Sequence, residues 1–353
     1  ALRRRRGRHT QEITTPAMRH SLLLLLFLLT ALLGAAAVWQ TDTVLGGDFK
    51  MHTVDMPDDY SGRVRSTVVK LRSDCADSTA VLYIHGYNDY FFQRDEAERL
   101  ADSCYHFYAV DLRKYGRSIL PGQQPYELRD VREYYADIDS AVALMRRDGI
   151  RHAVLMGHST GGLVASSYMA NHPDSIFSAL VLNSPFLDWN MSAFKRKVAV
   201  PVIGFLSKLF PRMKISQGSK PSPYGQSLLR GSHGEWDFNT DWKTIMPRKV
   251  ESSWIHAITS AQRDVRKGRI RVPVLLMHSD KSITGDEWTP EHQRGDAVLN
   301  VDHMHAIAPR LGADVTESVV PDALHDIFLS SEPVREDAYS KRFGWLRSRH
   351  IKK

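Results

Sequence analysis

The stretch Val154-Leu155-Met156-Gly157-His158-Ser159-Thr160-Gly161-Gly162 decides the fold of this chain. The apolar run 153–156 predicts a buried strand, and the residues from Leu163 onward favour a helix. Between them, Gly157-x-Ser159-x-Gly161 is the G-x-S-x-G pattern of a nucleophile elbow, which holds a serine on a tight strand-to-helix turn. The turn needs glycine because only a residue without Cβ lets the neighbouring backbone pack so closely. The helix would also direct its positive N-terminal end toward negative charge developing near the serine.

On both sides of this turn, apolar strands alternate with helical segments. Strands are predicted at 80–84, 107–111, 179–183, 272–278 and 315–320, and helices at 93–103, 127–147, 301–311 and 333–346. Residues 44–71 alternate apolar and polar side chains around a turn, which predicts an antiparallel hairpin. The alternation predicts an α/β fold with a mostly parallel, doubly wound sheet, in which ligands bind at the carboxyl ends of the strands.

One long segment, 185–268, interrupts the alternation and is rich in Trp, Phe, Met, Lys and Pro. We interpret it as a lid inserted between the two parts of one core, 44–184 and 269–347. Residues 348–353 form a basic tail. A solvated end is its simplest interpretation, with contact to an acidic membrane surface as the alternative.

The N-terminal segment 1–37 has the pattern of a targeting sequence. Its apolar run, Leu22–Val38, follows several arginines and ends in the small residues 34–37. This pattern predicts a cleaved signal peptide or an anchor formed by residues 21–39, and hence a protein that is exported (periplasmic or secreted) or held at a membrane. Six arginines and one glutamate place +5 of the net charge of +7 in residues 1–37, which leaves +2 for the rest. We therefore expect no nucleic-acid partner.

The chain has two cysteines, Cys75 and Cys104. In an exported protein an even pair can form one disulfide, and two free thiols are the alternative.

A serine hydroxyl needs a base and a group that orients the base before it becomes a good nucleophile. After an elbow the expected chain order is Ser159, then an acid, then His, and His325 lies in a short loop after the last predicted strand. Asp280, Asp296 and Asp302 are the candidate acids. We favour Asp296 because the apolar residues that follow it, Ala297-Val298-Leu299, would hold its carboxylate in a partly buried turn, whereas Asp302 is expected to cap a helix.

Four motifs in this order give the chain a resemblance to a known family. They are His85-Gly86-Tyr87, Asp111-Leu112-Arg113-Lys114-Tyr115-Gly116-Arg117-Ser118, Gly157-His158-Ser159-Thr160-Gly161-Gly162 and Leu324-His325-Asp326. Over about residues 45–347 the chain resembles the α/β-hydrolase superfamily, in its branch of monoacylglycerol lipases, lysophospholipases and serine aminopeptidases. Lys114 stands where the family has a glycine, and an insertion containing Trp288 precedes Asp296. After that insertion the family pattern resumes, which supports Asp296 as the acid.

The resemblance implies a role for each of these residues. Ser159 would be the nucleophile, His325 the base and Asp296 the group that orients it. The backbone N–H groups of Tyr87 and Thr160 would form the oxyanion hole. No metal or organic cofactor is implied. The implied substrate is a small-molecule or lipid ester, such as a monoacylglycerol or a lysophospholipid.

Other functions are open at this point. The same triad could cleave an N-terminal amide or transfer acyl groups, and Glu235, Asp237 or Asp241 could hold a substrate's amine. A non-catalytic binding protein on the same fold is a further alternative. Dehalogenases and epoxide hydrolases are disfavoured because they carry Asp in place of Ser159.

Overall fold

The computed structural model describes residues 37–351. Nearly all of the predicted leader, 1–37, lies outside this range, so the signal peptide or anchor stays a prediction. Within residues 37–351, no helix is long and apolar enough to cross a membrane.

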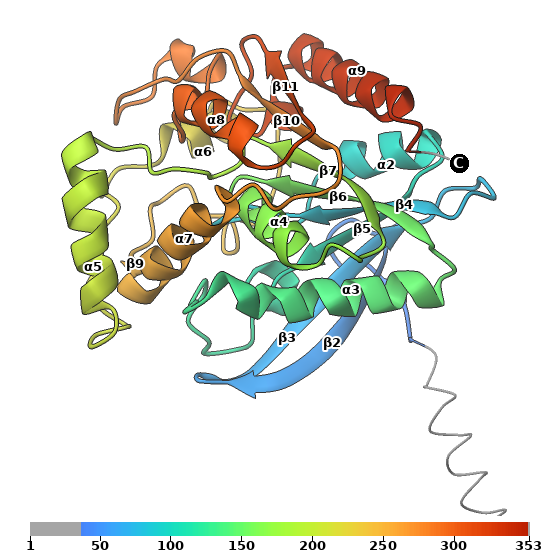
Figure 1. The fold of residues 1–353 in the computed structure, drawn as a ribbon, viewed down its shortest axis with the longest axis horizontal. Coiled ribbons are helices and arrows are strands. Elements are labelled where there is room, and N and C mark those ends of the chain that lie inside the picture. Colours follow the sequence, from blue (N-terminus) through green and yellow to red (C-terminus); the bar gives the residue numbers. More distant parts are fainter. Residues whose placement is uncertain (1–36, 352–353) are drawn as a thin grey trace, which may run out of the picture. The chain divides into compact units, whose positions relative to one another are not determined.

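A nine-stranded sheet organises the described part of the chain (Figure 1). In spatial order its strands are β1 (Gln40–Thr41), β2 (Lys50–Asp59), β3 (Gly62–Leu71), β5 (His106–Asp111), β4 (Thr79–Ile84), β6 (His152–His158), β7 (Phe177–Asn183), β10 (Val274–Ser279) and β11 (Val315–Val320). The pairs from β5 to β11 are parallel, whereas β1, β2 and β3 are antiparallel to their neighbours. The predicted mostly parallel sheet and its N-terminal hairpin are thus confirmed.

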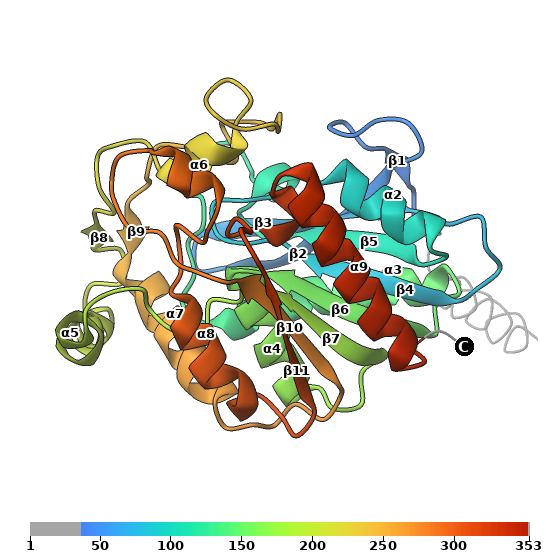
Figure 2. The same ribbon diagram turned by 90° about the horizontal axis from the view of Figure 1, so that it is seen from above.

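Helices cover both faces of the sheet (Figures 1 and 2). They are α2 (Arg94–Asp102) and α9 (Glu332–Ser348) on one face, with α3 (Tyr135–Arg147), α4 (Thr160–Asn171), α7 (Ser252–Val265) and α8 (Val301–Ile307) on the other. The central strands read as continuous apolar runs because both of their faces are buried. The doubly wound prediction is confirmed.

Two predicted helices are shorter than expected for local reasons. The helix predicted at 127–147 begins only at Tyr135, after a 3₁₀ turn, because Asp130 and Glu133 form a capping box that leaves the preceding residues extended. The helix predicted at 301–311 ends as α8 at Ile307, where Pro309 follows in another 3₁₀ turn. Asn300, and not Asp302, caps α8.

The predicted lid segment contains only short elements before α7. They are a π-helical turn, η3 (Lys195–Ala199), then α5 (Val200–Leu206), β8 (Lys214–Ile215), α6 (Pro223–Leu228) and β9 (Val250–Glu251). The strands β8 and β9 pair only with each other and add nothing to the main sheet. Its last helix, α7, packs on both α4 and α5, so it joins the segment to the helical layer of the core.

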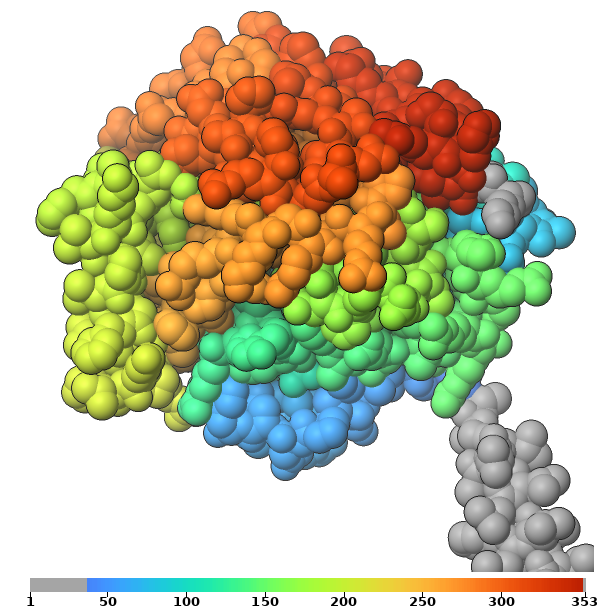
Figure 3. Space-filling model, viewed as in Figure 1, coloured from blue at the N-terminus to red at the C-terminus, as the bar shows by residue number. Residues whose placement is uncertain are grey.

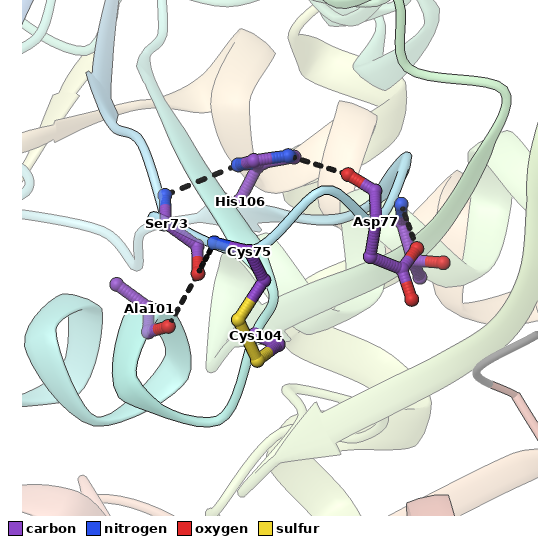
Figure 4. The surroundings of a disulfide bond; sticks show 7 residues. Ser73, Cys75, Asp77, Ala101, Cys104 and His106 are labelled. Carbon is purple, nitrogen blue, oxygen red and sulfur yellow. Dashed lines mark hydrogen bonds between the residues drawn. A yellow bond between two sulfur atoms is a disulfide. The ribbon is translucent and has the colours of Figure 1, made fainter.

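Cys75 and Cys104 form a disulfide, which selects between the two alternatives that the sequence left open (Figure 4). The bond joins the loop after β3 to the turn after α2. Beside it, the His106 ring accepts a hydrogen bond from the Ser73 N–H (3.1 Å) and donates one to the Asp77 carbonyl (2.7 Å). The disulfide and this imidazole together fix the edge of the first βα unit.

In the C-terminal tail, residues 348–350 are exposed, as expected for a solvated end, but the last described residue is not. Arg349 pairs with Asp314 at 2.7 Å, and the Ile351 side chain is buried in the main core. An ion pair and an apolar contact thus hold two residues of an otherwise exposed tail.

Candidate active site

Ser159 lies on a strained turn between β6 and α4. Its backbone has φ 52° and ψ −119°, a conformation that costs a non-glycine residue about 1–3 kcal/mol and persists only where packing imposes it. A Cβ on Gly157 would lie 2.5 Å from the Gly161 carbonyl oxygen, and one on Gly161 would lie 2.3 Å from the His85 carbonyl oxygen. The glycines of the motif are therefore required by close backbone contact, as the sequence predicted.

The structure brings Ser159, His325 and Asp296 into one hydrogen-bonded chain. The Ser159 hydroxyl lies 2.9 Å from Nε2 of His325, and Nδ1 of the same ring lies 2.8 Å from Asp296 Oδ2. Because a carboxylate can only accept, Nδ1 carries the proton and Nε2 is free to accept from the serine. The other Asp296 oxygen accepts the backbone N–H groups of Val298 and Leu299 at 2.8 and 2.7 Å. These two N–H groups fix the carboxylate, as the apolar residues after Asp296 suggested.

The two competing aspartates lie outside this chain of hydrogen bonds. Asp280 accepts the Asp322 N–H at 2.8 Å and lies near Lys281. Asp302 lies in the first turn of α8 and is exposed. Neither contacts His325 through any interaction found among the described residues.

The two expected oxyanion donors flank the serine. Thr160 is the first residue of α4, so its N–H belongs to the first turn, where no intrahelical acceptor exists. Tyr87 follows Gly86, at which an added Cβ would lie 3.2 Å from the Cβ of Ser159. The turn at Gly86 is therefore packed against the elbow, and Tyr87 is the next residue along the chain.

His158 lies beneath the triad, with its ring centroid 4.8 Å from that of His325. Burial lowers its pKa from 6.5 to about 4, because a charged imidazolium would lose its hydration there. The ring is therefore neutral near pH 7 and adds no positive charge that would disfavour a protonated His325.

A buried polar network holds the loop that carries His325. The Asp326 carboxylate accepts the Asn183 side-chain amide at 2.7 Å and the Gln93 amide at 3.3 Å, and Asn183 Oδ1 accepts the Ile327 N–H at 3.3 Å. Asn183 also accepts the Ser159 N–H at 2.9 Å through its own carbonyl. The network thus ties the loop of the base to the elbow. In the sequence, only the Asp that follows His325 points to this network.

A second set of contacts, also missed from the sequence, fixes the loop after Tyr87. The Lys243 ammonium lies 2.9 Å from Asp89, and both side chains are buried. Burial alone would raise the pKa of the Asp89 carboxyl, but the lysine holds it below its ordinary value. Asn88 adds hydrogen bonds to the Thr244 carbonyl (2.7 Å) and N–H (3.1 Å). No local sequence pattern predicts these contacts.

Lys114, the departure from the family pattern, has a structural explanation. Its φ is 64°, which accounts for the glycine in the family. The side chain is fully buried, and its ammonium pairs with Asp59 at 2.7 Å and Glu127 at 3.3 Å. Here the loop uses a buried cation where other members use backbone freedom.

The segment between β7 and α7 closes over the site. Ser159 is only 8% exposed, and the Tyr224 ring from α6 stands edge-on to His325 at 5.4 Å. On the other side Tyr87 packs against Trp254 of α7 at 4.7 Å. The nucleophile thus lies in a largely apolar, water-poor enclosure, where fixed hydrogen-bond donors act most strongly.

The elbow, the order Ser–Asp–His and the parallel sheet define an α/β-hydrolase. A family model described as "Serine aminopeptidase, S33" matches residues 76–332, so the chain belongs to this family.

Known proteins of the superfamily are similar over most of the chain. An AB hydrolase superfamily protein, YisY of Bacillus subtilis, is 24% identical over 235 residues, which are 63% of this chain and 81% of that protein. A monoglyceride lipase from Saccharomyces cerevisiae is similar in structure, with a TM-score of 0.62 and 17% identity over 85% of this chain and 95% of that one. The monoacylglycerol lipase of Paleococcus ferrophilus gives a TM-score of 0.57 and 20% identity over 84% and 98%.

Epoxide hydrolases match a shorter stretch. Epoxide hydrolase 4 of Mus musculus is 31% identical over 106 residues, which are 30% of this chain and 28% of that protein. At the elbow, where an epoxide hydrolase is expected to carry Asp, this chain has Ser159.

Proposed function

We propose that this protein is a serine hydrolase that cleaves carboxylic esters through an acyl-enzyme on Ser159. The observation that carries the proposal is the continuous hydrogen-bonded chain from Ser159 through His325 to Asp296. Ser159 Oγ attacks the carbonyl carbon while its proton passes to His325 Nε2, and Asp296 stabilises the imidazolium. The N–H groups of Tyr87 and Thr160 stabilise the oxyanion, each contributing about 3 kcal/mol in the transition state.

The second half of the reaction uses the same groups in reverse. His325 returns its proton to the leaving alcohol, which departs. Water then gives a proton to His325 and attacks the acyl carbon, and the acid is released as Ser159 is restored.

We propose a lipid-like ester, such as a monoacylglycerol or lysophospholipid, as the substrate. Two features support this choice. The site is enclosed by aromatic side chains, with Phe186 and Trp189 packed at 5.0 Å and Trp254 beside them. The structural similarity to two monoacylglycerol lipases points in the same direction. Residues 185–268 would then act as the lid that admits the acyl chain.

Aminopeptidase activity is less well supported because two of the three carboxylates expected for it have cationic partners, while the third, Asp241, is exposed. Glu235 pairs with Arg335 at 2.9 Å, and Asp237 pairs with Arg230 at 2.7 Å. Asp89, which lies nearer the serine, is neutralised by Lys243. To bind Glu235, Asp237 or Asp89, an incoming ammonium group would have to displace the cation already there.

We further propose that the protein is exported or membrane-anchored. The apolar run of the predicted leader suggests it, and the Cys75–Cys104 disulfide supports it, because disulfides persist mainly in oxidising compartments.

The test is turnover of p-nitrophenyl esters from acetate to palmitate by the full chain and by Ser159→Ala. We expect hydrolysis by the wild type, an optimum at medium or long chains, and loss of more than about 1,000-fold in the variant. An amino-acid p-nitroanilide series in the same assay addresses amide cleavage. Faster turnover of the anilides than of any ester would refute the ester proposal.

A further inference from the structure

The outer cap segment, residues 194–210, presents a row of apolar side chains to solvent. Phe194, Phe205, Leu209 and Phe210 are 71%, 65%, 67% and 60% exposed, and Val198 and Val202 are also exposed. Phe194 immediately precedes η3, Val198 lies in η3, Val202 and Phe205 lie in α5, and Leu209 and Phe210 follow the end of α5, so the exposed apolar side chains are spread over the whole segment. Three exposed phenylalanine rings in one short segment call for an explanation beyond the fold itself.

The opposite face of α5 packs against the rest of the cap. Val200 and Gly204 are buried, and α5 packs on α7, where a Cβ on Gly204 would lie 3.3 Å from the His256 ring. Arg196 pairs with Asp188 at 2.6 Å and anchors the start of the segment. The helix is thus held by its inner face, and the apolar row is available to a partner.

Along the sequence the charge of this segment is of one sign, although Arg196, Arg212 and Lys220 pair with carboxylates of other segments. Residues 190–222 contain no Asp or Glu and seven cationic side chains: Lys195, Arg196, Lys197, Lys208, Arg212, Lys214 and Lys220. Lys195, Lys197 and Lys208, which alternate with the exposed apolar positions, are themselves exposed and make no ion pair with any described residue. Apolar side chains flanked by unpaired lysines fit a surface that is both apolar and negatively charged.

We propose that the outer cap segment docks this protein onto a lipid surface that contains anionic headgroups. The phenylalanine and leucine side chains enter the boundary of the acyl region, and the lysines bind the headgroup phosphates. A second copy of this chain is a poorer occupant, because two such segments would bring like charges together. Figures 1 and 3 show α5, at the left in yellow-green, on the outer edge of the cap, where a flat surface can reach it. The proposal does not depend on hydrolase activity.

The test places an environment-sensitive fluorophore on the segment in the full chain. Because the described part of the chain has no free cysteine, Phe205→Cys offers a single labelling site, and Ala143→Cys on exposed α3 is the matched control. Both proteins retain residues 1–36, so any contribution of those residues is common to them. Each labelled protein, also carrying Ser159→Ala so that vesicles stay intact, is mixed with phosphatidylcholine vesicles with or without 30% phosphatidylglycerol.

We expect a blue shift of the fluorophore at position 205 on the anionic vesicles and none at 143. Replacing Lys195, Lys197 and Lys208 by Gln should weaken the binding on the order of 100-fold, because each lysine near such a surface contributes roughly a factor of five. An unshifted probe at 205 in a folded protein would overturn the proposal, as would an equal shift on vesicles without phosphatidylglycerol. A shift that needs no vesicles but rises with protein concentration would assign the face to self-association instead.

Discussion

The two halves of the cap treat their aromatic side chains in opposite ways. The inner cap segment, residues 222–244, turns its aromatic rings toward the core, where they pack with Tyr90, Phe92 and Leu329. The outer cap segment turns Phe194, Phe205 and Phe210 to solvent. Both are parts of one insertion of similar composition, so composition alone does not decide which half covers the site. What distinguishes the inner half is a set of polar contacts to the loop after Tyr87, which the outer half lacks.

The strongest test of this difference is Lys243→Met, which keeps the apolar stem but leaves Asp89 buried without its cation. We expect a loss of about 3–5 kcal/mol in the free energy of unfolding, measured by urea denaturation, together with reduced kcat because Gly86 and Tyr87 lose their support. The matched change in the outer half, Lys208→Met, should cost less than about 0.5 kcal/mol. Adding Asp89→Asn to Lys243→Met should recover part of the loss. Equal effects of the two lysine changes would erase the distinction between the halves.

The pH dependence of stability tests the core beneath the inner half. Since burial lowers the folded-state pKa of His158 to about 4, the unfolded chain binds one more proton than the folded one between about pH 4 and 6.5. This group's stabilisation is complete above pH 6.5 and is lost as the pH falls toward 4, by up to about 3 kcal/mol. Urea titrations across this range measure how the free energy of unfolding depends on pH. In His158→Gln the slope of this dependence should be smaller than in the wild type, by the contribution of one proton. An unchanged slope would mean that this imidazole is charged in the folded protein.

Asn88 connects the loop after Tyr87 to the inner half by two hydrogen bonds to Thr244, and its φ of 51° is tolerated well by asparagine. Asn88→Ala should cost about 2 kcal/mol. It should also lower kcat more than it raises KM, because the oxyanion donor moves while the acyl pocket stays. Asn88→Gly isolates the hydrogen bonds from the backbone conformation. If both variants lose stability but keep the wild-type kcat, the contact between Asn88 and Thr244 stabilises the fold without positioning the oxyanion donor.

The smallest effect is expected for the outer half. Phe205→Ser removes an exposed ring, so stability should change by less than about 0.5 kcal/mol, with no change in turnover of a water-soluble short-chain ester. Thermal unfolding and the acetate assay measure the two quantities. A loss of stability above about 2 kcal/mol would show that the ring contributes to the packing of the fold. The outer cap segment could then no longer be regarded as a surface available to a partner.

The sequence predicted well what depends on local pattern. Continuous apolar runs located the central strands because parallel strands are buried on both faces. The elbow was predictable because only glycine fits positions 157 and 161. Asp296 could be preferred over Asp280 and Asp302 because the apolar step after it implied a buried turn that holds the carboxylate.

What the sequence missed depends on pairs of residues far apart in the chain. Lys243 and Asp89 are separated by 154 positions, and Asn183 and Asp326 by 143. Neither pair leaves a trace in hydrophobic periodicity. The first becomes evident only when the cap is placed on the core, and the second only when β7 and the loop after β11 are brought together. The shortened helix at 127–147 was missed for the opposite reason, since a local capping box overrode a helical pattern.

The central claim, that Ser159 is an activated nucleophile, is tested most directly by reaction with a fluorophosphonate followed by peptide mass spectrometry. Wild type, Ser159→Ala and His325→Gln are treated in parallel after circular dichroism has shown that all three are folded. We predict a single phosphonate adduct on Ser159 in the wild type, none in Ser159→Ala, and labelling slowed by at least about 100-fold in His325→Gln, with ester turnover lost in step. A folded wild-type protein that gains no adduct at Ser159, or one that is labelled equally fast without His325, would contradict the account.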